Sequence, residues 1–215
     1  MFHDPFLARI HLSKHRLEAL ADGVFAIAVT LIVLDIKVPD LTRNAPFEAV
    51  AVALRHEAPA LLAFFITFMI SGLFWFMHQT SFHWIARIDR GLVFINIGFL
   101  MFVSLVPFST SMFAHFLGRP LGMMFYFGNA TMIAVFLNLH WMYAKRKGLL
   151  TAEDGDALER KLFQQRIAVI LLAFLLTCAL TPVMWQFVGF VPAAVFIVQR
   201  KREEKALARA AAAAA

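Results

Sequence analysis

The feature that most constrains this chain is a succession of long apolar runs separated by short polar segments. The runs are Leu20 to Val38, Ala60 to Gln79, Gly91 to Phe113, Gly118 to Tyr143, Phe163 to Thr181 and Val183 to Gln199. About 20 predominantly apolar residues suffice for one helical membrane crossing. With 61% hydrophobic and 16% charged residues among 215, the chain leaves no length for a separate soluble domain. The sequence therefore predicts an all-α membrane protein, with six transmembrane helices in a single domain over residues 1–205.

The two ends of the chain and the connections between the runs carry further expectations. Residues 1–20 lack a compact apolar core and a small-residue cleavage site, so we expect a retained cytoplasmic segment and not a cleaved signal. Residues 206–215 end in alanines and are expected to be a tail, partly a cloning remnant. Pro59 suits the first turn of the second helix, and Pro182 is expected to divide the last two helices into a tight hairpin. Phe47 to Pro59 has the pattern of a short amphipathic helix, which we expect at the outer membrane interface.

The distribution of Lys and Arg predicts which helix ends face the cytoplasm. The formal charge is +6, and 16 of the 20 Lys and Arg residues lie at the two termini, between the second and third runs, between the fourth and fifth, or in the first turn of the fifth, as Arg166 does. The remaining connections hold only Lys37, Arg43, Arg55 and Arg119. Because cytoplasmic loops carry the excess of Lys and Arg, both termini are expected in the cytoplasm of a multi-pass protein of the cell (inner) membrane. The basic residues thus explain topology, and nucleic acid is not expected as a partner.

Polar and ionisable side chains inside the apolar runs are the first candidates for function, because they are costly in a membrane unless they are partnered. They are Asp22, His78, Asn96, Asn138 and His140. All of them lie toward the cytoplasmic ends of the first four helices, so one polar layer is expected to join those helices. Other interpretations stay open: Asp22 can cap the first helix, and a buried histidine such as His78 more often packs with a hydrogen bond than carries protons.

One narrow face of the first helix carries only aliphatic side chains when residues are set about 100° apart. These residues are Ile27, Leu31, Leu34 and Val38. Gly23 and Thr30 lie at the edges of this face, and Asp22 points roughly 140° away from Ile27. In a monomer such a face would meet lipid or pack in the core, which is its ordinary role. In a symmetric oligomer it would face the central axis.

Motifs that would indicate other classes of protein are absent from the sequence. It contains no TVGYG-like filter, no H-E-x-x-H or Cys-x-x-Cys metal site, no G-x-G-x-x-G or phosphate loop, and no G-x-S-x-G nucleophile elbow. We therefore expect neither an enzyme nor a resident metal or cofactor. A coupled carrier normally keeps an acidic residue at mid-membrane. The nearest candidate here, Asp35, lies in the outer turn of the first helix.

The first helix contains a motif block that resembles a known family. From Arg16 the sequence reads RLEALADGVFAIAVTLIVLDI. This is similar to the first helix of the bacterial members of the transmembrane protein 175 family, relatives of the lysosomal potassium channel. That family carries an R-x-x-x-F-S-D signature followed by a G-V-F-A-I-A-x-T-L-L-V-L-E-I-like run. Arg16 and Asp22 match the signature, whereas Leu20 and Ala21 replace its Phe-Ser pair.

A second block extends the resemblance into the second and third helices. Its residues are Phe74-Trp75-Phe-Met-His78, then Asp89, Asn96, Leu100 and Pro107-Phe108. The two blocks span about the first half of the chain, and the second half resembles the family only in its spans and loop lengths. The resemblance implies a six-helix subunit, a homotetramer and a potassium-permeable pore lined by the first helix, without a separate filter loop.

The resemblance also assigns expected roles to residues. The family's hydrophobic constriction corresponds to Ile27, Leu31 and Leu34, and four copies of such a ring can gate by dewetting. The residues expected beside the pore are Gly23, Thr30, Asp35 and Val38. A structural polar network is expected from Arg16, Asp22 and His78, together with Asn96 of the polar layer. We add that four copies of Asp35 would concentrate cations at the outer mouth, although Asp35 can equally be a simple interfacial helix end.

Two functions are compatible with these sequence features. The predicted one is a potassium-selective or potassium-preferring cation channel, with monovalent cations, the lipid bilayer and three further copies of the chain as its partners. The alternative is a proton-linked secondary transporter that uses Asp22 and His78 as titrating groups. Electrogenic potassium flux with slower sodium flux would indicate the channel, whereas pH-gradient-driven uptake abolished by His78→Ala would indicate the transporter.

Overall fold

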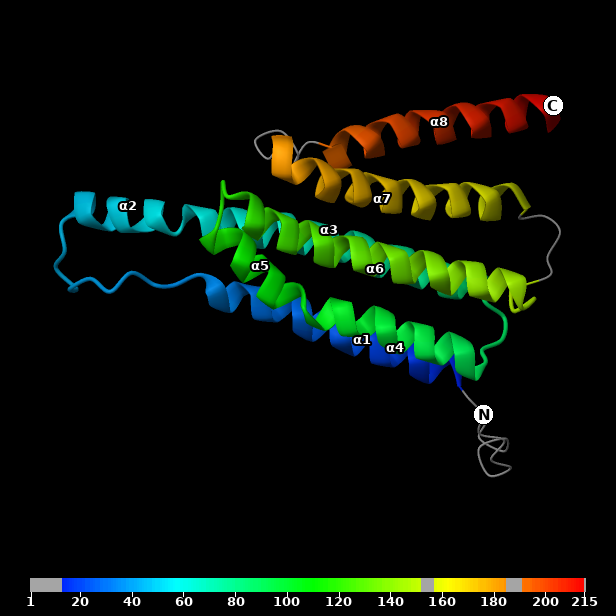
Figure 1. Ribbon diagram of the computed structural model, residues 1–215, viewed down its shortest axis with the longest axis horizontal. Coiled ribbons are helices and arrows are strands. Elements are labelled where there is room, and N and C mark those ends of the chain that lie inside the picture. The colour runs from blue at the N-terminus through cyan, green and yellow to red at the C-terminus, as the bar shows by residue number, and fades with distance from the viewer. Residues whose placement is uncertain (1–12, 152–156, 185–190, 215) are drawn as a thin grey trace.

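The computed structural model describes residues 13–151, 157–184 and 191–214, and its long helices lie side by side along one direction (Figure 1). One outer layer holds α1 (Lys14–Leu31) and α4 (Arg90–Ser104), the middle layer α3 (Ala58–Trp84) and α6 (Pro120–Arg146), and the other outer layer α7 (Ala157–Met184) and α8 (Val191–Ala214). Consecutive long helices run in opposite directions, so α1 begins and α8 ends at the same end of the bundle (Figure 1). The predicted all-α class is confirmed.

The first helix is shifted toward the N-terminus relative to its predicted span. α1 begins at Lys14 and gives way to a 3₁₀ turn, η2 (Ile32–Asp35), after which the backbone is extended at Ile36. Pro39 disfavours helical backbone at Val38, the residue before it. The predicted continuation of the helix to Val38 is therefore wrong, and Val38 lies in the connection that follows.

The predicted short helix before the second span is present as α2 (Phe47–His56), and none of its residues is buried. Its place at a membrane interface stays a prediction. α3 starts one residue before Pro59, where the missing N–H of proline costs no helical hydrogen bond. The connection from α1 is tied to this point, because the Lys37 backbone N–H donates to the Glu57 carboxylate at 3.1 Å.

The third predicted helix is interrupted, which the sequence reasoning did not anticipate. α4 ends at Ser104, and α5 (Val106–His115) begins after Leu105. Pro107 has no N–H to offer the preceding turn, and the Leu105 N–H bends back to the Phe102 carbonyl at 3.2 Å. The Asn129 side-chain amide of α6 donates to that same carbonyl at 3.2 Å. The break is thus satisfied within the protein, as a membrane environment requires.

The last two helices are not divided where the sequence reasoning placed their boundary. Pro182 lies inside α7, which continues to Met184. A proline so close to a C-terminal end removes a single hydrogen bond and need not stop the helix. Val183, assigned to the sixth span, therefore belongs to α7. α8 begins at Val191 and continues through residues 206–214, the segment expected to be a tail.

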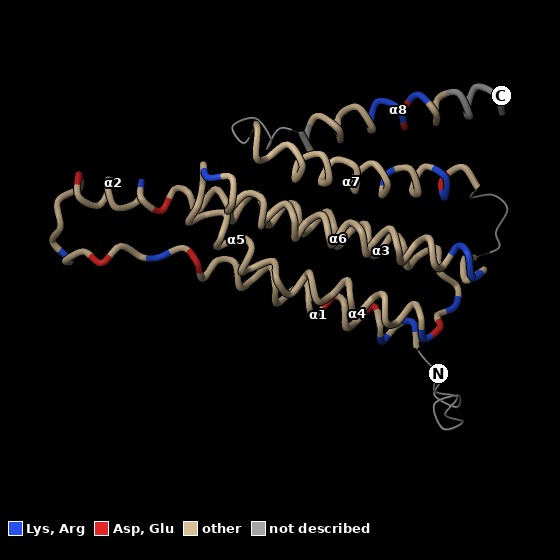
Figure 2. The backbone as a smooth tube through the Cα atoms, viewed as in Figure 1, with Lys and Arg blue, Asp and Glu red and all other residues tan. Residues whose placement is uncertain are grey.

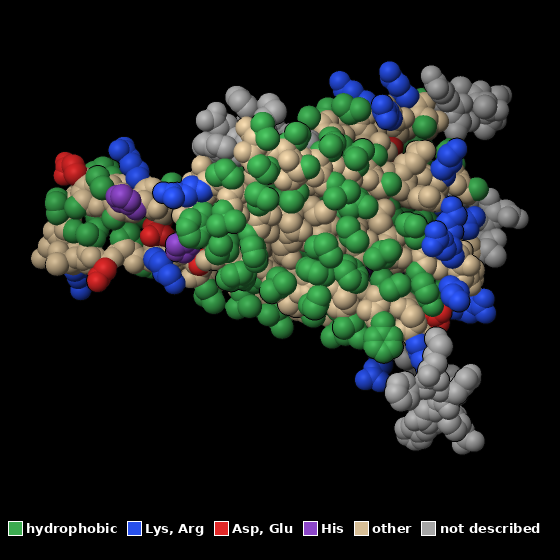
Figure 3. Space-filling view, viewed as in Figure 1, with side chains coloured by type: hydrophobic (Ala, Val, Ile, Leu, Met, Phe, Trp, Pro, Cys, Tyr) green, Lys and Arg blue, Asp and Glu red, His purple; other side chains and the backbone are tan. Residues whose placement is uncertain are grey.

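Several helices in the described part of the chain are long and apolar enough to cross a membrane. The five that qualify are Lys14–Asp35, Ala58–Trp84, Arg90–His115, Pro120–Arg146 and Ala157–Val183. Apolar side chains cover the middle of the bundle accordingly (Figure 3). α8 differs, because its apolar first part gives way at Gln199 to the sequence QRKREEK. A membrane protein with several spans is confirmed, and the count of six stays a prediction.

Lys and Arg gather at the end of the bundle where α1 begins and α8 ends, which we call the basic end (Figure 2). Two loops meet here through backbone hydrogen bonds, from Ala86 N–H to the Leu149 carbonyl and from Thr151 N–H to the Trp84 carbonyl, both at 2.9 Å. Gly148 makes the turn after α6 with a φ of +62°, a conformation that glycine adopts at little cost. The basic residues that predicted the topology thus lie mostly at one end of the bundle. The side of the membrane that this end faces stays a prediction.

Candidate pore-lining helix and its polar support

α1 has two unlike faces. The buried face packs against α3 and α4 through Leu17, Ala21, Phe25 and Ala28. On the other face, Ile27, Leu31 and Leu34 expose 62%, 45% and 65% of their surface in the single chain. We call these three residues the aliphatic stripe. Because so much of their surface is uncovered, they contribute little burial energy to the fold of one subunit.

The change from α-helix to 3₁₀ helix keeps Leu34 in line with the rest of the stripe. Residues three apart eclipse each other in a 3₁₀ helix, so Leu34 follows Leu31 along one side. Ile32, in the same turn, is 2% exposed and points into the core. Val38 is 92% exposed but lies beyond the helical backbone, so it does not extend the stripe as helical periodicity had predicted.

The other residues expected beside the stripe occupy distinct environments. The Thr30 hydroxyl donates to the Ala26 and Ile27 carbonyls at 2.8 and 3.0 Å, which leaves its oxygen lone pairs as acceptors. Gly23 is exposed, and a Cβ placed on it would meet nothing within 4 Å. Asp35 is half-buried and accepts a hydrogen bond from the Ser111 hydroxyl at 3.2 Å, which holds η2 against α5.

Asp22 lies more than two turns inside α1 and not at its start. The interpretation of Asp22 as a helix cap is therefore wrong. Its carboxylate accepts a hydrogen bond from the Trp75 indole N–H at 2.8 Å and another from the Gln79 amide, both on α3. Trp75 and Gln79 are four residues apart and share one face of that helix. Arg16 is exposed and has no hydrogen bond or ion pair with any residue that the structure describes.

His78 lies on a different face of α3 and is buried. Its Nε2 is 2.7 Å from Oδ1 of Asn96 on α4, and its ring stacks on Phe99 with centroids 4.8 Å apart. His140 of α6 lies beside it, with ring centroids 5.8 Å apart, and its Nδ1 is 3.2 Å from the Ser81 hydroxyl. We call His78, Asn96, Ser81 and His140 the buried polar cluster. It joins α3, α4 and α6.

The expected single polar network is therefore divided into two parts. Asp22 bonds to Trp75 and Gln79 of α3. His78 lies about 60° round that helix from Trp75 and about 100° from Gln79, and it bonds to Asn96. Asn138, also expected in the layer, donates instead to the Ile167 carbonyl at 2.9 Å and links α6 to α7.

Sequence reasoning missed a second group of buried polar side chains, further from the basic end. Thr67 donates to the Tyr126 hydroxyl, and Thr110 donates to Thr67, both at 3.1 Å. Threonine is frequent in membrane helices and often bonds to its own backbone, so it gives little signal in a sequence. Tyr126 gave the better signal, because it is one of only two tyrosines and lies within an apolar run.

These features define a class of protein: a helical integral membrane protein whose first helix keeps an uncovered apolar face. Among the described residues, no group of three or more His, Cys, Asp or Glu side chains is placed to hold a metal ion. The polar side chains are used instead to join helices, which is their usual role inside a membrane bundle.

Comparison with known proteins identifies the family. The Endosomal/lysosomal potassium channel TMEM175 family matches residues 16–107. A potassium channel of Streptomyces collinus is 35% identical over 169 residues, which is 77% of this chain and 81% of that one. The crystal structure of a lysosomal potassium-selective channel TMEM175 homolog from Chamaesiphon minutus matches with a TM-score of 0.68 and 30% identity, over 88% of this chain and 97% of that one. The chain belongs to the TMEM175 family, and the resemblance found in the sequence is confirmed.

One further relative bears a different functional name. The endosomal/lysosomal proton channel TMEM175 of Danio rerio is 39% identical over 101 residues, or 45% of this chain. The match covers only 19% of that longer protein.

Proposed function

We propose that this chain is one subunit of a homotetrameric potassium channel of the cell membrane, with four copies of α1 around the pore. The observation that carries the proposal is the aliphatic stripe. Ile27, Leu31 and Leu34 stay uncovered while the opposite face of the same helix is packed. The Streptomyces and Chamaesiphon relatives are named as potassium channels, which supports potassium as the permeant ion.

The proposed pore needs no resident cofactor. A ring of four Ile27 side chains, with Leu31 and Leu34 beyond it, forms an apolar constriction that disfavours water when it is narrow and so closes the pore by dewetting. Thr30 presents oxygen lone pairs beside this ring. Asp35, positioned by Ser111, raises the local cation concentration at the far mouth.

The proposed topology has six passes with both termini in the cytoplasm. α8 supplies the sixth pass, running back along α7 toward the basic end. The excess of Lys and Arg at that end favours a cytoplasmic location under the positive-inside rule.

The test is ion flux in liposomes that contain the purified protein. Wild type is expected to give electrogenic potassium flux with slower sodium flux. Ile27→Asn places a polar group at the constriction and is expected to raise potassium flux about tenfold, equivalent to ~1.4 kcal/mol. Ile97→Asn is the matched control, because Ile97 of α4 is also an exposed isoleucine but lies outside the stripe.

Two results would overturn the proposal. Equal flux changes in Ile27→Asn and Ile97→Asn would remove α1 from the pore lining. A monomer by mass measurement in detergent, with flux retained, would exclude a pore formed by four copies of α1.

The proton-linked transporter remains as the second candidate, supported by two buried histidine ring nitrogens. His78 Nδ1 and His140 Nε2 have no partner among the described residues. Against it, Asp22 and His78 share no hydrogen bond: Asp22 accepts from Trp75 and Gln79, whereas His78 is bonded to Asn96. Uptake driven by a pH gradient, abolished by His78→Gln while the oligomer persists, would favour this candidate over the channel.

A further inference from the structure

A groove runs along the outside of the bundle between α3, α7 and α8, away from the aliphatic stripe. Its apolar part has a volume of about 320 Å³ and is lined by side chains such as Leu73, Ala173 and Val195. A second hollow of about 380 Å³ adjoins it toward the basic end, and Leu73, Arg166 and Gln199 line both. From Arg166 to Phe174 along α7 the groove is about 12 Å long, at 1.5 Å per helical residue.

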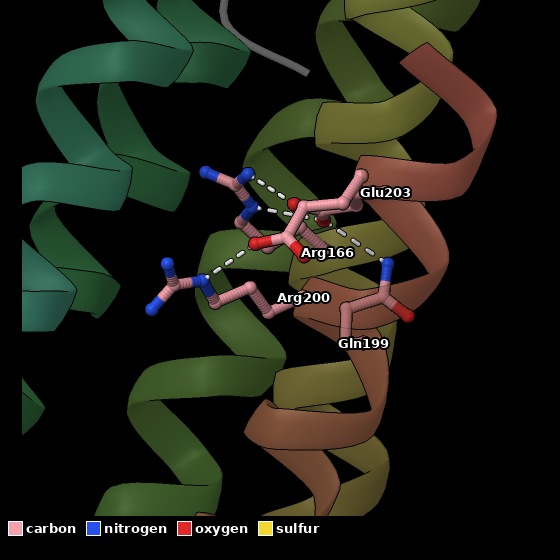
Figure 4. Close-up of polar contacts among 5 residues, drawn as sticks. Arg166, Gln199, Arg200 and Glu203 are labelled. Carbon is pink, nitrogen blue, oxygen red and sulfur yellow. Dashed lines mark hydrogen bonds and ion pairs between the residues drawn. The ribbon is translucent and has the colours of Figure 1, made fainter. Parts of the chain in front are cut away.

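The groove ends in a group of charged side chains (Figure 4). Arg166 of α7 donates to the Glu203 carboxylate of α8 through Nε at 3.1 Å and also through Nη2. Arg200 donates to Glu204 at 2.9 Å through Nε alone. The guanidinium groups of Arg166 and Arg200 point to the same side, and both residues line the second hollow.

The two ion pairs differ in strength. Only 10% of the Glu203 side chain is exposed, and its carboxylate accepts hydrogen bonds from both Arg166 and Gln199 at 3.1 Å. Glu203 is thus a firmly held partner of Arg166. The Arg200 and Glu204 side chains are both well exposed, and such a pair is worth little in water. Arg200 can therefore exchange Glu204 for another anion at small cost.

Donors remain for that anion. Within the described chain, Nη1 of Arg166 and both Nη atoms of Arg200 have no hydrogen-bond partner. An apolar groove that ends in free guanidinium donors is complementary to an amphiphile with an acyl chain and a phosphate. A guanidinium recognises a phosphate through paired charge-assisted hydrogen bonds.

We propose that this groove binds an anionic glycerophospholipid, with one acyl chain between α3, α7 and α8 and the phosphate on Arg166 and Arg200. Lys201, Arg202 and Lys205 of α8 add to the positive field at the same end. Basic pockets between membrane helices are the usual sites for such headgroups. A helix from a second copy fits less well, because its apolar side chains would meet the free guanidinium nitrogens. The proposal does not depend on potassium conduction.

The experiment counts lipids bound to the full-length protein by native mass spectrometry in detergent, while phosphatidylglycerol or phosphatidylcholine is titrated. Arg200→Gln is expected to weaken phosphatidylglycerol binding about tenfold, as the loss of one charge-assisted contact implies. Arg202→Gln is the control, because Arg202 is an exposed neighbour that does not line the hollow. Val195→Phe fills the groove and is expected to reduce binding of both lipids, whereas exposed Val198→Phe should leave it unchanged.

Three outcomes would overturn the lipid site. Equal losses in Arg200→Gln and Arg202→Gln would show general charge attraction, and equal affinity for phosphatidylcholine would show that no anion is recognised. A lower subunit count in Val195→Phe, with lipid binding intact, would show that a second copy covers the groove. Since lipid retention is measured without any flux, failure here leaves the channel proposal untouched.

Discussion

The aliphatic stripe and the buried polar cluster reverse the arrangement of a water-soluble protein. Ile27 and its neighbours on the stripe are exposed, whereas His78, Asn96 and His140 are each no more than 1% exposed. In a membrane, burying an apolar side chain against protein gains little over lipid, so packing shape and hydrogen bonds select the helix pairs. The fold should therefore be sensitive to changes in the interior and tolerant of changes in the stripe, where conduction should be affected instead.

A large effect is expected where an aromatic side chain of one helix packs directly on a glycine of another. Gly98 of α4 faces Phe136 of α6, and a Cβ at Gly98 would overlap the aromatic ring. Phe136 also packs on Phe102 with centroids 5.4 Å apart, which limits how far it can swing away. Gly98→Ala is expected to lower the free energy of unfolding by about 2 kcal/mol, as overpacked cores do. The measurement is the midpoint of thermal unfolding in detergent.

Gly128→Ala provides the matched control for this prediction. Gly128 lies in α6, where a Cβ would meet nothing within 4 Å. Alanine favours a helix over glycine by up to about 1 kcal/mol, so Gly128→Ala should be neutral or stabilising. If Gly98→Ala were equally harmless, the interior would be loosely packed and the comparison with the stripe would lose its basis.

The next effect concerns the buried polar cluster. Asn96→Leu removes the 2.7 Å contact to His78 and leaves that ring nitrogen buried without a partner. The expected loss is about 1.5 kcal/mol in the free energy of unfolding. The double variant His78→Leu with Asn96→Leu should lose less than the sum of the two single variants, because no polar group of the pair is then left unpaired. Additive losses would mean that the two side chains do not stabilise each other.

A smaller effect is expected at the second polar group. Tyr126→Phe removes the hydroxyl that accepts from Thr67, but Thr67 keeps its contact with Thr110. A loss of about 0.6 kcal/mol is expected, the average for interhelical hydrogen bonds in a membrane. Tyr143→Phe removes the hydroxyl of the other tyrosine, which lies at the basic end and donates to Asp89 at 2.8 Å. Water can replace this contact, so Tyr143→Phe should cost less, and a larger cost there would contradict the ranking.

The sequence predicted features that depend on one segment alone better than features that depend on the neighbouring helices. The apolar runs located the helices, because a membrane span needs little beyond length and hydrophobicity. Helix ends required knowledge of neighbours: Pro107 coincides with a break that Asn129 of another helix helps to satisfy, whereas Pro182 is accommodated within α7. The two prolines look alike in sequence, and only the surroundings distinguish them.

The same distinction applies to the candidate site. The face carrying Ile27 and Leu31 follows from helical periodicity alone, so its orientation was predictable. Whether Asp22 contacts His78 was not predictable, because that contact depends on which face of α3 turns toward α1. Trp75 and Gln79, on that face, take the contact that had been expected for His78.

The smallest effect on the fold is expected in the stripe. Leu31→Ala removes a side chain that is 45% exposed in the subunit, and the free energy of unfolding should change by less than about 0.5 kcal/mol. Leu100→Ala is the matched control, because Leu100 is 6% exposed and its truncation leaves a cavity in the packed interior, so its loss of stability should clearly exceed that of Leu31→Ala. If four copies of Leu31 narrow the pore, Leu31→Ala should raise potassium flux or reduce the preference over sodium, while Leu100→Ala should mainly lower the amount of folded protein. A loss of stability in Leu31→Ala comparable to that of Leu100→Ala, with flux per folded subunit unchanged, would place the stripe in a packed interface and not in the path of the ion.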